Sequence, residues 1–123
     1  MLSLTLPVRI FLCMEPTDMR RGFDRLAATA YQVTQQDPLS GHLFVFINRR
    51  KNRVKILYWD KSGYCLWYKR LEKGCFHLPQ SGCKQDHIEL DTAGITLMLE
   101  GIDLAESRRY KRFSLPQKND KKV

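Results

Sequence analysis

Cationic side chains are concentrated in one short segment of the sequence, NRRKNRVK, at residues 48–55. Five of the seven residues from Arg49 to Lys55 are arginine or lysine, and apolar, β-branched and aromatic residues flank them on both sides. Long cationic side chains on the turn of a hairpin can reach phosphate groups while the flanking strands hold them in register. The segment therefore predicts either a phosphate-binding turn or a solvated turn that keeps a hairpin soluble.

Charge is unevenly distributed along the 123 residues, whose formal net charge is +8. Residues 1–48 are neutral, residues 49–84 carry +8, residues 85–107 carry −6 and residues 108–123 carry +6. Clustered positive charge favours polyanionic partners through electrostatic steering and counterion release. The alternative is charge that only maintains solubility, with the acidic block partly neutralising a basic one. DNA contact is favoured because the cations cluster rather than spread.

Nine cations are the candidates for nucleic-acid contact. They are Arg20, Arg21, Arg49, Arg50, Lys51, Arg53, Lys55, Lys69 and Arg70. For the first two, a solvated helix face is the alternative, because Asp24 can pair with them across one helical turn. Tyrosines and tryptophans follow along the same ribbon, and exposed ones can stack on unpaired bases. In strands, however, such residues more often fill the core with a polar tip outward.

Four side chains that can ligate zinc lie within thirteen residues, in the spacing C-x-H-x5-C-x3-H. They are Cys75, His77, Cys83 and His87. The spacing lacks the paired C-x2-C knuckle that is typical of zinc sites, and a glycine- and proline-containing loop explains the segment equally well. We therefore expect no metal and no cofactor. With no signal peptide in the sequence, we expect reduced cysteines in a cytoplasmic protein.

Catalytic chemistry has little support in the sequence, which contains no G-x-S-x-G, Walker or H-E-x-x-H motif. A metal-dependent nuclease needs several carboxylates that meet at one site. Asp18, Asp24 and Asp60 are available, but arginines and lysines surround them in the sequence. We expect no catalytic residues.

The elements that position these residues predict one α+β domain over residues 1–107, followed by a basic, flexible tail over residues 108–123. Alternation and short connections favour an antiparallel meander of four to five strands. A long amphipathic helix of about four turns packs on one face, and a second helix lies near the C-terminus. The predicted strands are residues 5–12, 43–47, 52–59, 64–71 and 88–90; the first helix is capped by Thr17 or Asp18 and runs to Val33 or Thr34, and the second spans Thr92–Leu104. No apolar run is long enough to span a membrane.

Three segments resemble one known family in their order and spacing. They are TDMRRGFDRLA, DPLSGHLFVFINRRKNRVKILYWDKSGYCLWYKRLEKGCFHLP and LMLEGID. They are similar to the TnpB-type accessory protein from the second open reading frame of bacterial insertion sequences of the sixty-six family, which differs from the RNA-guided nuclease of the same name. The resemblance covers residues 8–104. At the positions of Cys75 and His77 the family commonly has a basic residue and a tryptophan, which weakens the zinc hypothesis.

The resemblance implies a non-catalytic accessory role in insertion-sequence DNA transposition. In such elements a separate, larger protein resembles an acidic-triad transposase and carries the strand-transfer chemistry. We expect the basic hairpin to bind DNA at the element ends, in the bacterial cytoplasm or nucleoid. The alternative is a protein-interaction module that recruits or activates the transposase without contacting DNA. The acidic residues of 86–106 and the aromatic ribbon are the features that would serve it.

Overall fold

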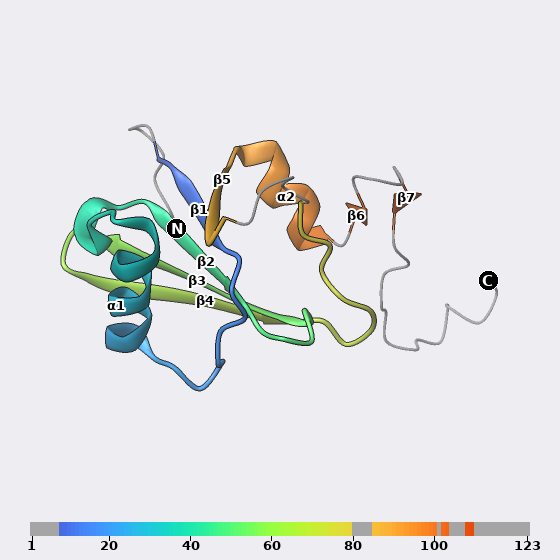
Figure 1. Cartoon of the computed structure of the whole chain (residues 1–123), viewed down its shortest axis with the longest axis horizontal. Helices are drawn as coiled ribbons and strands as arrows, with labels where there is room; N and C mark the ends of the chain where they lie inside the picture. The colour runs from blue at the N-terminus through green and yellow to red at the C-terminus, as the bar shows by residue number, and fades with distance from the viewer. Residues whose placement is uncertain (1–7, 80–84, 101, 104–107, 110–123) are drawn as a thin grey trace, which may run out of the picture.

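A five-stranded sheet lies between two helices, one on each face (Figure 1). The computed structural model describes residues 8–79, 85–100, 102–103 and 108–109. In chain order the elements are β1 (Ile10–Cys13), α1 (Phe23–Thr34), the 3-10 helix η1 (Pro38–Ser40), β2 (Leu43–Ile47), β3 (Arg53–Asp60), β4 (Gly63–Arg70), β5 (His87–Leu90), α2 (Thr92–Glu100), β6 (Ile102–Asp103) and β7 (Arg108–Arg109).

The sheet is mixed, with the strand order β4-β3-β2-β1-β5. β1 pairs with β2 in parallel and with β5 in antiparallel orientation. The expectation of a wholly antiparallel meander is therefore wrong at β1. Residues 14–42 separate β1 from β2 and include α1, and a helical crossover of this length is the connection that a parallel pair requires.

The meander prediction is confirmed for β2, β3 and β4, which are antiparallel neighbours with short turns. β2 has the predicted bounds, and the other two strands are displaced from the predicted bounds by about one residue. The β3–β4 ladder runs from the Arg53–Arg70 pair to the Asp60–Gly63 pair, so the two turns of the meander lie at opposite ends.

The first helix is shorter than predicted, because α1 has only 12 residues, about three turns. Gly22 precedes it in an extended conformation, with φ −102° and ψ −158°. A helix continuing upstream would use the carbonyls of Met19 and Arg21 as acceptors for backbone N–H groups. Both carbonyls instead accept hydrogen bonds from the Lys55 side chain. Phe23, the first residue of α1, is 48% exposed.

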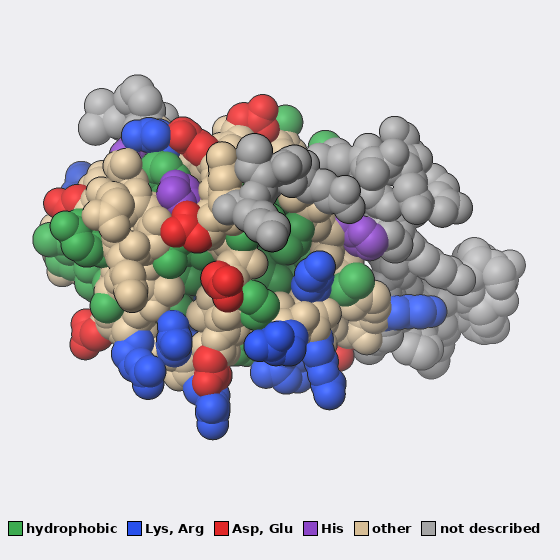
Figure 2. Space-filling view, in the orientation of Figure 1, with side chains coloured by type: hydrophobic (Ala, Val, Ile, Leu, Met, Phe, Trp, Pro, Cys, Tyr) green, Lys and Arg blue, Asp and Glu red, His purple; other side chains and the backbone are tan. Residues whose placement is uncertain are grey.

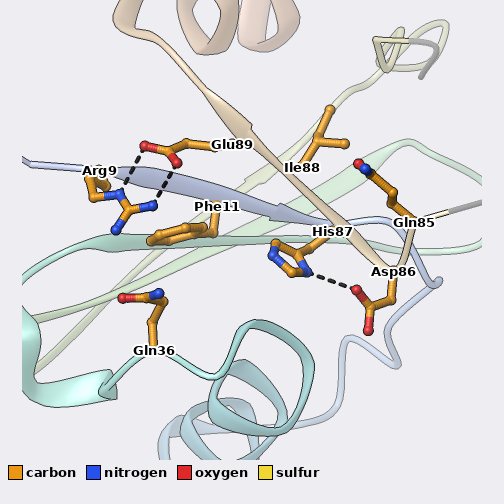
Figure 3. A pocket seen from close by; sticks show the side chains of 8 residues that line it. All are labelled: Arg9, Phe11, Gln36, Gln85, Asp86, His87, Ile88 and Glu89. Atoms are coloured by element: carbon orange, nitrogen blue, oxygen red, sulfur yellow. Dashed lines mark hydrogen bonds and ion pairs between the residues drawn. The ribbon is translucent and has the colours of Figure 1, made fainter. Parts of the chain in front are cut away.

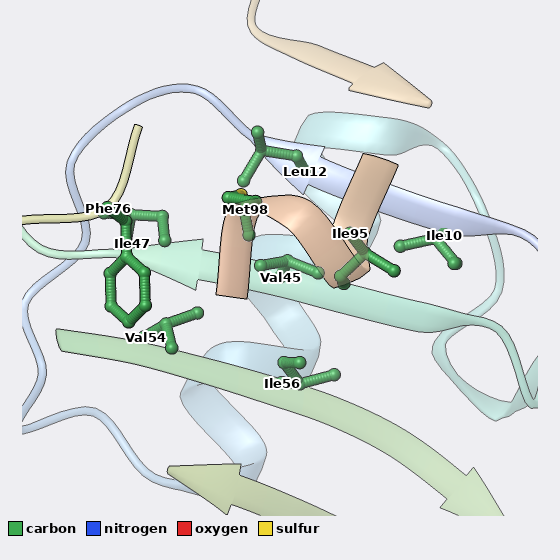
Figure 4. Close-up of a cluster of buried hydrophobic side chains, with 9 residues drawn as sticks. All are labelled: Ile10, Leu12, Val45, Ile47, Val54, Ile56, Phe76, Ile95 and Met98. Carbon is green, nitrogen blue, oxygen red and sulfur yellow. The ribbon is translucent and has the colours of Figure 1, made fainter. Parts of the chain in front are cut away.

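Two hydrophobic clusters, one on each face, hold the helices to the sheet. On the α2 side, Ile95 and Met98 pack over alternate residues of β1, β2 and β3, and Phe76 from the segment after β4 completes the cluster (Figure 4). On the α1 side, Leu26, Ala27 and Ala30 pack over Phe11, Phe44, Phe46 and Leu57. The strand alternation thus gives β3 one face toward each helix.

The second helix is confirmed near the C-terminus, but α2 ends at Glu100 rather than at Leu104, which lies outside the described residues. β6 and β7 form a separate antiparallel pair, so the first two residues of the predicted tail form a short strand. The boundary after residue 107 stays a prediction. Within the described part of the chain, no helix is long and apolar enough to cross a membrane.

Candidate nucleic-acid interface

A groove of about 590 Å³ lies where the loop before α1 meets the turn between β2 and β3. Residues 16–21 form one wall, and residues 48–50, 52 and 53 form the other; we call it the arginine groove. Its volume falls within the range of about 300–1,000 Å³ that is typical of ligand sites. The charged residues that line it are Asp18, Arg20, Arg21, Arg49, Arg50 and Arg53, with a net charge of +4. Figure 2 shows Lys and Arg side chains gathered along the lower edge of the molecule, where these two segments lie in Figure 1.

The β2–β3 turn is shaped by one asparagine. The side-chain oxygen of Asn48 accepts hydrogen bonds from the backbone N–H groups of Asn52 and Arg53, at 3.0 and 2.9 Å. Its backbone oxygen accepts one from the N–H of Lys51, which takes the left-handed conformation with φ 61°. Arg49 and Arg50 therefore occupy the two central positions of a closed turn.

The same turn is braced from the opposite side of the sheet. The backbone N–H of Phe76 donates to the Lys51 carbonyl at 2.6 Å, and that of Leu71 donates to the Asn52 carbonyl at 2.8 Å. The Phe76 side chain is buried in the α2-side cluster. Because core residues anchor the bracing segment, the turn presents its arginines from a fixed position.

The other wall is attached to the end of β2. The backbone N–H of Thr17 donates to the carbonyl of Ile47, the last residue of β2, at 2.8 Å. Thr17 itself is buried, and the N–H of Arg21 closes a turn onto the carbonyl of Asp18. Both walls are thus attached to the same end of β2: the turn follows this strand in the chain, and the loop that leaves β1 is hydrogen-bonded to its last residue.

Lys55 builds the groove from beneath rather than lining it. The residue is 7% exposed, and its Nζ donates to the carbonyls of Met19 and Arg21 at 2.6 and 2.9 Å. The same ammonium lies 4.8 Å from the centre of the Tyr68 ring. The expectation that Lys55 contacts DNA does not fit this burial. Its ammonium fixes the loop that carries two of the groove arginines.

Three of the five groove arginines already contact other side chains. Arg20 forms a two-pronged ion pair with Asp18, with Nη2–Oδ2 at 2.7 Å, and this guanidinium holds the pKa of the Asp18 carboxyl below its usual range. Arg21 donates from Nη1 to Thr29 Oγ1 at 3.0 Å, and Arg53 donates from Nη1 to Tyr68 Oη at 3.2 Å. Their guanidinium groups are therefore partly oriented.

Arg49 and Arg50 differ from the other three. Both are exposed, and within the described part of the chain neither side chain has a partner. An arginine without an ion pair does not have to break one before it binds a phosphate. Its binding free energy therefore benefits fully from Arg–phosphate hydrogen bonds, which are charge-assisted and often two-pronged.

The remaining predicted cations lie outside the groove. Lys51 is exposed at the turn itself. Lys69 faces the α2 side, where its Nζ donates to the carbonyl of Leu99 at 3.1 Å near the end of the helix. Arg70 is exposed and paired with Glu72. The structure thus brings five of the nine candidates together and gives two of the others, Lys55 and Lys69, contacts with backbone carbonyls.

The carboxylates considered for a nuclease do not meet. Asp18 lies at the groove, whereas Asp60 ends β3, an eight-residue strand that spans roughly 23 Å from its start near the groove. Among the described residues, no group of three or more His, Cys, Asp or Glu side chains is placed to hold a metal ion. Cys83, one of the four candidate zinc ligands, lies outside them.

A second hollow of about 590 Å³ lies on the α1 side near β1 and β5 (Figure 3). Arg9 forms a two-pronged ion pair with Glu89 there, which lowers the pKa of the Glu89 carboxyl. His87 Nδ1 lies 2.8 Å from Asp86 Oδ1. The hollow is lined by one cation, Arg9, and two carboxylates, so it offers no excess positive charge for a polyanion. The sequence analysis missed this hollow because its residues come from opposite ends of the chain.

Comparisons with known proteins found one matching family and two similar proteins. The profile of a family described as "IS66 Orf2 like protein" matches residues 8–109. "Uncharacterized protein y4hO" from Sinorhizobium fredii (strain NBRC 101917 / NGR234) is 38% identical over 96 residues, which cover 78% of this chain and 82% of the relative. "Uncharacterized protein y4jC" from the same strain is 33% identical over 102 residues, which cover 83% and 86%. No solved structure matches the chain significantly.

Proposed function

Because the chain belongs to the IS66 Orf2-like family of insertion-sequence proteins, we propose that it binds DNA during transposition through the arginine groove. The family is one of accessory proteins and is not a known catalytic family. In this proposal the chain contributes DNA binding, and a separate transposase carries out strand transfer.

The observation that supports the proposal is the convergence of arginines from two distant segments. Arg20 and Arg21 precede α1, while Arg49, Arg50 and Arg53 belong to the β2–β3 turn, and all five line one groove. Positive charge that serves only solubility does not require cations from distant segments to line one groove. Here Thr17, Asn48 and Lys55 hold both walls by hydrogen bonds to the backbone. A site built in this way suits a phosphate backbone.

A salt series on paired variants tests the proposal. Arg49→Ala/Arg50→Ala removes the two groove arginines that have no partner among the described residues. Lys61→Ala/Lys73→Ala removes two exposed lysines outside the groove as a charge-matched control. Each lost phosphate contact flattens the slope of log K against log salt by about 0.9 on duplex DNA, or about 0.7 on single strands. We expect the arginine variant to lose about two such contacts. Equal slopes and affinities for both variants would refute the proposal.

A second candidate, recruitment or activation of the transposase, has a different surface. Asp86, Glu89 and Asp91 are exposed on and beside β5, the sheet edge opposite β4, and they can face a basic partner. The test is co-purification of the two proteins in the absence of DNA, with wild type compared with Asp86→Asn/Asp91→Asn. No complex at any salt concentration counts against this role.

A further inference from the structure

Tyr68 is an exposed aromatic side chain whose ring is nevertheless held in place. It lies on the edge strand β4 and is 47% exposed. The Lys55 ammonium lies 4.8 Å from the ring centre, and the Arg53 guanidinium donates to the phenolic oxygen at 3.2 Å. Contacts at one ring face and at the tip restrict both rotatable bonds of the side chain. A ligand that binds such a ring avoids most of the entropy cost of ordering it.

The fixed ring is connected to the arginine groove through Arg53. Lys55 and Tyr68 are directly opposite each other in the β3–β4 ladder, and Arg53 is the next residue of β3 on the same face. Arg53 and Tyr68 are therefore diagonal neighbours, about 7–8 Å apart between backbones. Arg53 also lines the groove, so one guanidinium connects the phosphate-binding wall to the aromatic ring.

From this arrangement we propose that the groove takes single-stranded DNA, with an unpaired base stacked on Tyr68 and the adjacent phosphates held by Arg49 and Arg50. The inference rests on the proposed function and adds the class of nucleic acid. In a duplex each base is already stacked between its neighbours, so no base face is available to a side chain at the backbone. An unpaired base offers that face, and stacking on one aromatic ring strengthens binding by about 5- to 150-fold.

β4 provides its own matched control. Trp67 is the adjacent residue and is 43% exposed, but it lies on the opposite face of the sheet from Tyr68 and the groove. Removing either ring takes an exposed aromatic from the same strand. Only the loss of Tyr68 removes the proposed stacking partner.

The experiment measures fluorescence anisotropy of the full chain with labelled oligo-dT, a duplex of equal length and oligo-rU at one salt concentration. The variants are Tyr68→Leu, Tyr68→Phe, Trp67→Leu and Arg49→Ala/Arg50→Ala, each checked for folding by its thermal melt. We expect wild type to bind oligo-dT more tightly than duplex. Tyr68→Leu weakens oligo-dT binding about 5- to 150-fold and changes duplex binding less than twofold. Tyr68→Phe and Trp67→Leu stay within about threefold of wild type, because both keep a ring at position 68.

The outcomes separate this inference from the proposed function. Duplex binding as tight as oligo-dT binding, with both dependent on Arg49 and Arg50, overturns the single-strand inference and leaves the proposed function standing. Tighter binding of oligo-rU than of oligo-dT overturns the assignment to DNA. If Tyr68→Leu is unfolded, the ratio of oligo-dT to duplex affinity in wild type still tests the single-strand inference. Failure to bind any of the three refutes the proposed function as well.

Discussion

Replacing Lys55 with methionine separates the support of the arginine groove from its charge. The lysine lies beneath the groove and donates to the carbonyls of Met19 and Arg21. Methionine keeps an unbranched apolar stem of similar length and removes the ammonium. We therefore expect Lys55→Met to destabilise the fold and to weaken DNA binding, although the residue has almost no exposed surface for a phosphate.

Three effects, which differ in sign, set the change in the free energy of unfolding. Two hydrogen bonds from a charged donor contribute about 1.5–3 kcal/mol each, so about 3–6 kcal/mol is lost. The variant no longer dehydrates an ammonium, which returns several kcal/mol. The two carbonyls lose their donor, but Arg20 beside them is exposed, so the loop can shift to let water reach them. The net expectation is a loss of about 2 kcal/mol, which lowers the Tm by roughly 8–9 °C.

Urea and thermal unfolding measure this loss, and Lys61→Met is the matched control. Lys61 is exposed in the β3–β4 turn, at the end of β3 far from the groove, and its exchange removes the same charge. We expect the control to stay within about 0.5 kcal/mol of wild type. If Lys55→Met unfolds with the same free energy as Lys61→Met, the two hydrogen bonds do not support the loop, and our reasoning about the groove wall is wrong.

Three further predictions concern the core and the ionisable groups. Burial raises the pKa of the Cys13 thiol to about 12, so at pH 8 iodoacetamide should leave this thiol unmodified while half-buried Cys75 reacts. Peptide mass spectrometry measures the labelling, and equal labelling of the two cysteines would contradict the prediction. The pKa of Asp18 is depressed by its arginine partner, so its stabilising effect is present above the ordinary aspartate pKa and is lost as pH falls toward the folded value. The unfolding free energies of Asp18→Asn and wild type, measured in urea, should therefore differ by a constant amount from pH 8 to about 5, and the difference should begin to shrink below about pH 4. Phe46→Ala should cost about 3–5 kcal/mol, whereas Tyr31→Ala, at a residue 54% exposed, should change the unfolding free energy by less than about 0.5 kcal/mol.

The sequence predicted the local parts of the fold better than the site. Short turns and alternating strands indicated β2, β3 and β4 close to their observed bounds, because hairpin pairing depends on residues near one another in the chain. The role of Lys55 was not predictable in this way. Its acceptors lie 34 and 36 residues upstream, and a cation in a basic run looks the same whether it faces solvent or a loop carbonyl.

The parallel placement of β1 explains why the arginine groove exists. In a parallel pair, the end of β1 lies beside the end of β2, so the loop that leaves β1 emerges next to the β2–β3 turn. The hydrogen bond from the backbone N–H of Thr17 to the carbonyl of Ile47 joins the loop to the end of β2. Had β1 been antiparallel to β2, its exit would lie at the opposite end of the sheet, and Arg20 and Arg21 would be separated from the turn. The single strand whose orientation was wrongly predicted is therefore the one that assembles the two halves of the site.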